Sequence, residues 1–275
     1  METKEYTYAT LEEGAALTAD VYYKPGAGND VKAAQPIVIL IYGGGFVAGS
    51  KAAVSKSRLD SLIHDSGFTV VVPDYRHCST VSVFDGPVTD IHNCYSWTRE
   101  KLPALLSRDT GVLINGSRVV VIGSSAGGTL VLHLASASPP PKAIVSYFSA
   151  MNLKDEFWHS PMEVLSKVPS FSQDFLQQIM NEGVVTATPS SFKRVPGNPK
   201  PVPDFSRSRT AWFLSNLRDG TWIRNVVQDN DYQRVDPSEL FSDKFPQHAL
   251  FTEAKIRCVF RGSQRRHMSC CCRSM

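Results

Sequence analysis

The sequence predicts an α/β protein with a doubly wound, mostly parallel sheet. Four continuous runs of apolar, largely β-branched residues have the composition of strands buried on both faces: residues 37–42, 69–73, 119–123 and 143–148. Segments with apolar residues at helical spacing separate these runs, and this alternation is typical of parallel sheets with right-handed crossovers. The chain of 275 residues is 42% hydrophobic and 20% charged, which excludes disordered, collagen-like and coiled-coil proteins.

The elements can be assigned in order along the chain. Residues 5–10 and 15–23 alternate enough to predict an antiparallel strand pair that turns at Glu13-Gly14. Helices are expected between successive buried strands, over residues 55–66, from about 87 to 103, and over 126–137.

The pattern changes after Ala150. Residues 151–235 contain aromatic residues and many prolines but no run typical of a buried strand, which predicts a helical insertion with a proline-rich loop. The core of the fold would then comprise residues 1–150 and 236–260, with one more short strand at Cys258-Val259-Phe260. Residues 261–275 are expected to form an irregular, basic, cysteine-rich tail.

Charge and cysteine are unevenly distributed. The net charge is +3, but six basic and no acidic residues follow from Lys255 onward, so the preceding body is mildly acidic. Cys78 and Cys94 are the two cysteines of the body, which favours reduced thiols over a disulfide framework. No apolar run is long enough to span a membrane, and the first residues are polar, so a cytoplasmic location is expected.

Two glycine-containing motifs follow buried strands. Residues 123–127 match G-x-S-x-G between a strand and a helix, the setting in which a serine is exposed on a sharp turn. Residues 42–46, Tyr-Gly-Gly-Gly-Phe, end the first buried strand. Backbone N–H groups in such a glycine loop can stabilise a carbonyl oxygen that becomes negatively charged.

Together with Val72-Pro73-Asp74-Tyr75-Arg76 and Gly128, these motifs resemble the α/β-hydrolase fold and, more narrowly, the hormone-sensitive-lipase-like esterases. The resemblance implies that Ser125 is the nucleophile of an ester hydrolase that acts on small-molecule esters. It also implies an oxyanion hole formed by the N–H groups of Gly43, Gly44 and Ala126, and it requires neither a metal nor an organic cofactor. Tyr42 stands where the family motif has histidine, a residue that braces the glycine loop.

The resemblance also implies that residues 151–235 form a helical cap and that the last strand and helix of the family's core are missing. It fails where the family has its catalytic acid and base. Arg265 stands at the expected position of the aspartate and Arg261 at that of the pattern's histidine, and no acidic residue follows Glu253. His267 alone has the chain order expected of the base. Three histidines lie in predicted helices with structural roles, and His77 is expected on a loop surface; the helical ones are His64, His92 and His133.

We hypothesise that the tail from about Arg261 is not the family's native ending and results from a shifted reading frame or a retained intron. Hydrolytic activity of this chain would then be absent or severely reduced. Reading the downstream gene in the other frames tests this hypothesis, and finding no late Asp and His codons there would contradict it.

Other functions remain open. The chain could be a non-catalytic binding protein of the same fold or a non-functional truncated product. Its tail formally fits a prenylation box at Cys272, a zinc set of Cys258, His267 and Cys270, or a basic patch for nucleic acid or anionic lipid. None of these has a supporting motif, so neither a nucleic-acid partner nor a stable membrane anchor is expected, and the oligomeric state stays open.

Overall fold

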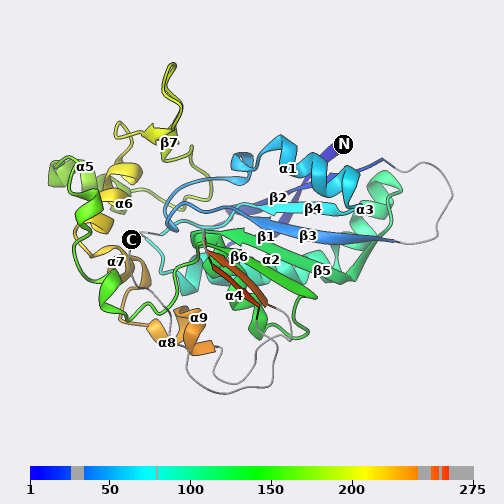
Figure 1. Ribbon diagram of the computed structural model, residues 1–275. Helices are drawn as coiled ribbons and strands as arrows, with labels where there is room; N and C mark the ends of the chain where they lie inside the picture. The colour runs from blue at the N-terminus through cyan, green and yellow to red at the C-terminus, as the bar shows by residue number, and fades with distance from the viewer. Residues whose placement is uncertain (26–33, 79, 241–248, 254–255, 260–275) are drawn as a thin grey trace.

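An eight-stranded sheet forms the centre of the computed structural model, which describes residues 1–25, 34–78, 80–240, 249–253 and 256–259 (Figure 1). The strand order is β1-β2-β4-β3-β5-β6-β9-β10. The strands are β1 (Glu2–Thr10), β2 (Ala16–Tyr23), β3 (Gln35–Ile41), β4 (Thr69–Pro73), β5 (Ile114–Ser124), β6 (Ala143–Tyr147), β9 (Ala249–Glu253) and β10 (Ile256–Val259). The five central strands from β4 to β9 are parallel, whereas β2 and β10 pair antiparallel with their neighbours. This is the mostly parallel sheet of the α/β-hydrolase fold, so the predicted fold class is confirmed.

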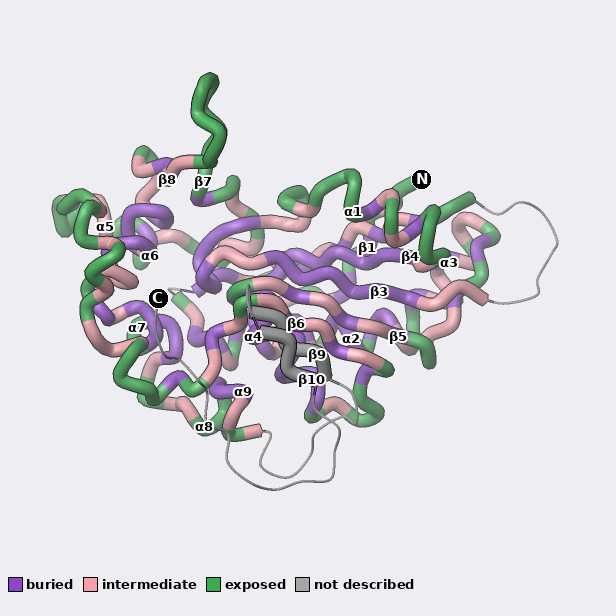
Figure 2. The backbone as a smooth tube through the Cα atoms, in the orientation of Figure 1, coloured by how far each residue is buried: buried purple, intermediate pink, exposed green. Residues whose placement is uncertain are grey.

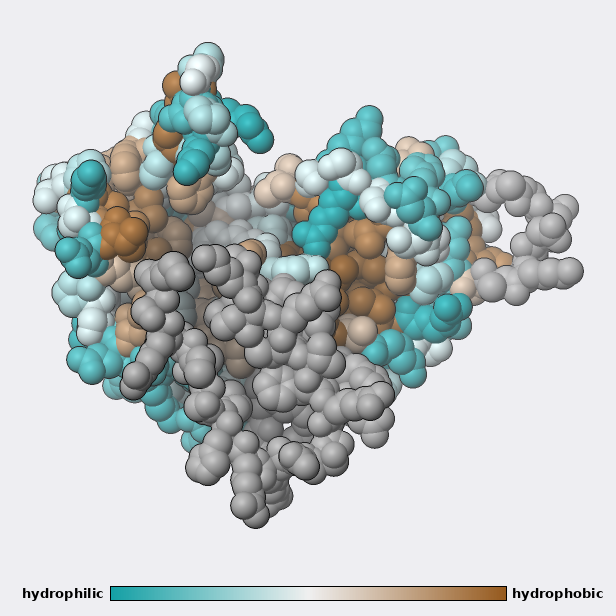
Figure 3. All heavy atoms as spheres, viewed as in Figure 1, coloured by the Kyte–Doolittle hydropathy of each residue, from teal (hydrophilic) through white to brown (hydrophobic). Residues whose placement is uncertain are grey.

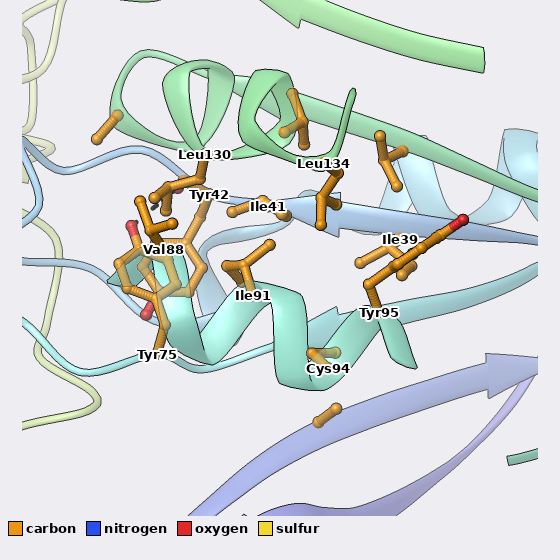
Figure 4. Close-up of a cluster of buried hydrophobic side chains, with 14 of the residues drawn as sticks. Ile39, Ile41, Tyr42, Tyr75, Val88, Ile91, Cys94, Tyr95, Leu130 and Leu134 are labelled. Carbon is orange, nitrogen blue, oxygen red and sulfur yellow. Dashed lines mark hydrogen bonds between the residues drawn. The ribbon is translucent and has the colours of Figure 1, made fainter. Parts of the chain in front are cut away.

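Helices cover both faces of the sheet because alternate side chains of a strand point to opposite faces. From β3, Ile37, Ile39 and Ile41 pack with residues of α2 (Thr89–Glu100), α3 (Leu102–Thr110) and α4 (Ala126–His133). Figure 4 shows Ile39 and Ile41 among side chains of α2 and of the helical segment that starts with α4. On the other face, Val38 and Leu40 pack with α1 (Lys56–Asp60) and the π-helical turn Ser61–Asp65 that continues it. Figure 2 shows the resulting concentration of buried residues along the central strands.

Two boundaries differ from those predicted. The helix predicted to end near Pro103 ends at Glu100, but an unpredicted helix, α3, begins at Leu102, with Pro103 in its first turn, where a missing N–H has no cost. The predicted strand at residues 258–260 corresponds to β10, but the strand that pairs parallel with β6 is the unpredicted β9. No parallel strand follows β9 among the described residues.

In the described part of the segment between β6 and β9, no element is longer than the 11 residues of α6. The elements are the 3-10 turns Glu156–Trp158, Glu163–Leu165 and Gln178–Met180, with α5 (Gln173–Gln177), β7 (Phe192–Lys193), β8 (Val202–Pro203), α6 (Ser208–Arg218), α7 (Trp222–Val227), α8 (Tyr232–Val235) and α9 (Pro237–Leu240). Most of this segment lies beyond the carboxyl ends of the parallel strands, at the left of Figure 1. Its surface mixes polar and apolar side chains (Figure 3), and the exposed apolar ones include Phe157, Val164 and Met180. None of the helices in the described ranges is long and apolar enough to cross a membrane.

Candidate active site

Ser125 lies on a strained turn between the last residue of β5 and the first residue of α4. Its backbone has φ 54° and ψ −127°, a conformation that costs a non-glycine residue about 1–3 kcal/mol. The side chain is exposed, and the Ser125 N–H donates to the carbonyl of Tyr147 at the end of β6 over 2.8 Å. The turn therefore presents the hydroxyl at the carboxyl edge of the sheet.

The two glycines of the G-x-S-x-G motif are needed for steric reasons. A Cβ at Gly123 would lie 2.1 Å from the carbonyl oxygen of Gly127, and one at Gly127 would lie 2.4 Å from that of Ile41. These contacts are with backbone atoms, which cannot rotate away as a flexible side chain can. Only glycine lets α4 approach β3 and β5 closely enough to form this turn.

The glycine loop, residues 42–48, lies against Ser125. A Cβ added at Gly43 would be 2.8 Å from the Ser125 Cβ and 3.5 Å from its Oγ. Two successive residues of this loop, Gly45 and Phe46, have left-handed backbones with φ of 62° and 64°. The loop is thus tightly turned at the point where it meets the serine.

The carbonyl groups of the glycine loop are held by hydrogen bonds. Four of them accept a hydrogen bond from a donor outside the loop. The Tyr42 carbonyl accepts from the Tyr75 hydroxyl (3.1 Å) and the Gly45 carbonyl from Trp222 Nε1 (3.0 Å). The Phe46 carbonyl accepts from the Cys78 N–H (2.8 Å) and the Val47 carbonyl from Arg209 (2.7 Å). The Gly44 carbonyl accepts from the N–H groups of Val47 and Ala48.

The amide N–H groups next to Ser125, unlike the loop carbonyls, have no backbone hydrogen-bond partner among the described residues. Within the described part of the chain, the N–H groups of Gly43, Gly44 and Ala126, the three predicted oxyanion donors, give no hydrogen bond to another backbone group. Such unpaired amides are the kind of donor that can bind a developing oxyanion.

Tyr42 supports the structure beneath the loop. Its ring stacks on that of Tyr75 (Figure 4), and the ring centroids are 4.6 Å apart. Its hydroxyl donates to the Thr186 carbonyl over 3.3 Å and lies 3.3 Å from His77 Nε2. Burial raises the pKa of Tyr42, so the phenol stays protonated and able to donate.

His77 was expected on a loop surface, and this is wrong. The side chain is only 1% exposed, because the chain turns inward after β4 and the His77 N–H donates to Val185. Burial lowers the pKa of His77 to about 3, so the ring is neutral at physiological pH. A local loop pattern could not show that residues 182–188 cover it.

The remaining titratable candidates are engaged elsewhere. Asp90 forms a buried ion pair with Arg76, and the Asp74 carboxylate accepts the N–H of Lys51 over 2.7 Å. His133 Nε2 lies 2.6 Å from the carbonyl of Val235. The His133 contact agrees with its predicted structural role, and Asp74 and Asp90 are likewise held by structural partners.

Ser125 Oγ has no hydrogen-bond partner among the described residues. The tail from residue 260 onward lies outside the described residues, and with it His267, Arg261 and Arg265. The prenylation box at Cys272 and two members of the possible zinc set, His267 and Cys270, lie there as well. The geometry therefore brings Ser125 together with the glycine-loop amides, and the predicted base is not placed.

Sequence reasoning missed Arg209 and Trp222. Both lie in the segment predicted as an insertion, on α6 and α7, and both bind carbonyls of the glycine loop. Arg209 also forms an ion pair with Glu182. An arginine that is only 6% exposed needs such partners, but nothing in the local sequence indicates them.

Comparison with known proteins gives a family match over part of the chain. Residues 20–150 match the family model BD-FAE. The chain is 37% identical over 154 residues to the non-reducing polyketide synthase ausA of Emericella nidulans and 35% identical over 229 residues to prhL of Penicillium brasilianum. These matches cover 54% and 77% of this chain but only 6% and 9% of the two synthases. The chain thus spans less than a tenth of these curated relatives.

A solved structure of similar fold is that of a Staphylococcus aureus protein of unknown function. It superposes with a TM-score of 0.58 at 16% identity and covers 88% of this chain and 76% of that protein. At this identity the similarity concerns the fold alone.

Proposed function

We propose that this chain, which has the α/β-hydrolase fold and matches the BD-FAE family model over residues 20–150, is a serine hydrolase scaffold for carboxylic esters. The observation that carries the proposal is the exposed, strained Ser125 beside amides that have no backbone partner. Strain at a non-glycine residue persists where the surrounding structure imposes it, and such sites cluster in active centres.

In the proposed reaction, the Ser125 hydroxyl attacks the ester carbonyl and loses its proton to a base. The Gly43, Gly44 and Ala126 amides stabilise the oxyanion of the tetrahedral intermediate. Departure of the alcohol leaves an acyl-enzyme, which water hydrolyses through a second tetrahedral intermediate. Residues 151–235, beyond the carboxyl ends of the strands, would cover the bound substrate.

The described residues do not place a catalytic base beside Ser125. Since no described residue bonds to Ser125 Oγ, activity would rest on the oxyanion hole and substrate binding unless His267 supplies the base. Loss of the base typically costs several orders of magnitude in kcat. We therefore expect slow turnover.

The test is labelling of the purified chain with a fluorophosphonate probe, together with hydrolysis of p-nitrophenyl acetate and butyrate. Labelling that maps to Ser125 and is lost in Ser125→Ala supports the proposal. No labelling and no hydrolysis above the Ser125→Ala variant would favour the non-catalytic binding protein. Rapid turnover that Ser125→Ala abolishes would refute the impairment, and a His267→Ala variant would then show whether His267 is the base.

The similarity to polyketide synthases prompts the test of a second substrate class. An alignment over 77% of this chain is 35% identical to the non-reducing polyketide synthase prhL, and we propose acyl thioesters as the second class. A serine that attacks an oxygen ester can attack a thioester by the same steps. Comparing rates on an N-acetylcysteamine thioester and a p-nitrophenyl ester of the same acyl group distinguishes the two, and a higher kcat/KM for the thioester would favour this candidate.

A further inference from the structure

We propose that Trp222 is a positioning residue of the oxyanion hole: its indole N–H fixes the Gly45 carbonyl so that the glycine-loop amides stay directed toward the substrate oxygen. This inference rests on the proposed function. It concerns a residue of α7, in the segment predicted as an insertion and distant in sequence from every motif of the site.

The contact is buried and specific. Trp222 is 5% exposed, and its Nε1–H donates to the Gly45 carbonyl over 3.0 Å. The ring is held by other aromatic rings on several sides, with centroid distances of 5.9 Å to Phe46, 5.5 Å to Phe213 and 5.7 Å to Trp158. The indole therefore has little freedom to lose this bond by rotating.

The bond acts on a peptide that is under strain. Gly45 and Phe46, the residues on either side of this peptide, both have left-handed backbones, and phenylalanine adopts that conformation at a cost. Rotation of the peptide plane between them offers a route to relax the loop. That rotation would leave the Trp222 N–H buried without a partner, a cost of about 1–3 kcal/mol.

Rotation of this peptide would also damage the proposed oxyanion hole. It reverses the directions of the Gly45 carbonyl and the Phe46 N–H, so that a carbonyl dipole turns away from α7. The backbone next to the Gly44 amide would change with it, and a displaced donor stabilises the tetrahedral intermediate less well. Trp222 thus acts through the glycine loop and does not touch the reacting atoms.

The neighbouring bonds support this assignment. Phe213 closes the loop from the side of α6, since a Cβ at Gly45 would lie 2.3 Å from its ring. Arg209 holds the Val47 carbonyl, two residues further along. With the Gly45 and Val47 carbonyls both bound from the segment 208–227, the loop conformation depends on that segment.

The test compares Trp222→Phe with Trp158→Phe. Both changes keep an aromatic ring in the same cluster and both remove one indole N–H bond to a carbonyl, because Trp158 Nε1 donates to Met151 over 2.9 Å. Only the first bond reaches the glycine loop. We expect Trp222→Phe to lower kcat for p-nitrophenyl benzoate about 10- to 100-fold with little change in KM, and Trp158→Phe to retain kcat within about twofold.

A sulfur-substituted substrate separates positioning from general loss of structure. Thiocarbonyl sulfur accepts hydrogen bonds weakly, so the ratio of rates on p-nitrophenyl benzoate and its thionobenzoate analogue measures the contribution of the oxyanion donors. This ratio should fall in Trp222→Phe and stay at the wild-type value in Trp158→Phe. An unchanged ratio in both variants would overturn the proposal.

Amide hydrogen exchange supplies a measurement that needs no turnover. The N–H groups of Val47 and Ala48 both donate to the Gly44 carbonyl, so their protection reports the closed loop. Exchange at these two amides should accelerate in Trp222→Phe and not in Trp158→Phe. If the wild-type chain hydrolyses no ester, the proposed function fails, and equal protection in both variants would independently refute the role of Trp222.

Discussion

Replacing Gly43 by alanine tests how closely the glycine loop approaches the serine. Gly43 has no left-handed backbone, so the substitution adds one methyl group without backbone strain. That Cβ would lie 2.8 Å from both the Ser124 carbonyl oxygen and the Ser125 Cβ, about 0.6 Å short of ordinary contact. Because one neighbour is backbone, the turn that carries the nucleophile has to move.

The expected cost follows from this displacement. Overpacking of this kind lowers the free energy of unfolding by about 1–3 kcal/mol. A misplacement approaching 1 Å costs about 100-fold in rate, so a shift of about 0.6 Å should slow reaction at Ser125 at least tenfold. The assay is the second-order rate constant of fluorophosphonate labelling, with urea unfolding measured on the same sample.

Gly183→Ala is the matched control. Gly183 also lacks a left-handed backbone, but a Cβ there meets no atom within 4 Å. This variant should label at the wild-type rate and unfold within about 1 kcal/mol of wild type. Wild-type labelling and wild-type stability in Gly43→Ala would show that the loop is not pressed against Ser125.

Three further variants test strain, close approach and burial. Ser125→Gly should be more stable to urea than Ser125→Ala by about 1 kcal/mol, since glycine adopts φ 54° without strain; equal midpoints would argue against a strained turn. Gly123→Ala should lose more than about 3 kcal/mol of unfolding free energy, because its Cβ would lie 2.1 Å from a backbone oxygen, and a near-wild-type urea midpoint contradicts that geometry. Burial lowers the pKa of His133 from 6.5 to about 4, so its stabilising contribution is complete above pH 6.5 and is lost as the pH falls toward 4. His133→Gln should therefore lose stability less steeply over this range, by up to about 1.4 kcal/mol per pH unit, and parallel curves of unfolding free energy against pH would refute the assignment.

The parts of the fold that the sequence predicts are those that depend on local patterns. The predicted runs at 37–42, 69–73, 119–123 and 143–148 overlap the parallel strands β3, β4, β5 and β6, because a strand buried on both faces requires a continuous apolar run. The position of Ser125 can also be predicted from a short stretch of sequence, because the strand, the two glycines and the helix are contiguous.

The hydrogen bonds that hold the glycine loop could not be predicted, because they join distant parts of the chain. Trp222 reaches Gly45 across 177 residues, and Arg209 reaches Val47 across 162. Each is a single polar contact without periodicity, so no window of sequence contains both partners. The burial of His77 has the same origin, since it depends on residues 182–188 packing over it.

The reactivity of Ser125 depends on the folding of helix α4, which begins directly after it. All eight residues of α4, Ala126–His133, are buried, although Ser125 immediately before them is exposed. Helix α4 contacts β3, β5 and β6, so it cannot detach without exposing the main hydrophobic core. Fraying of the chain ends or of surface loops would leave the serine in place, whereas cooperative melting would remove it. Covalent reactivity at Ser125 is therefore a reporter of the folded fraction, and its loss on heating should coincide with the calorimetric transition.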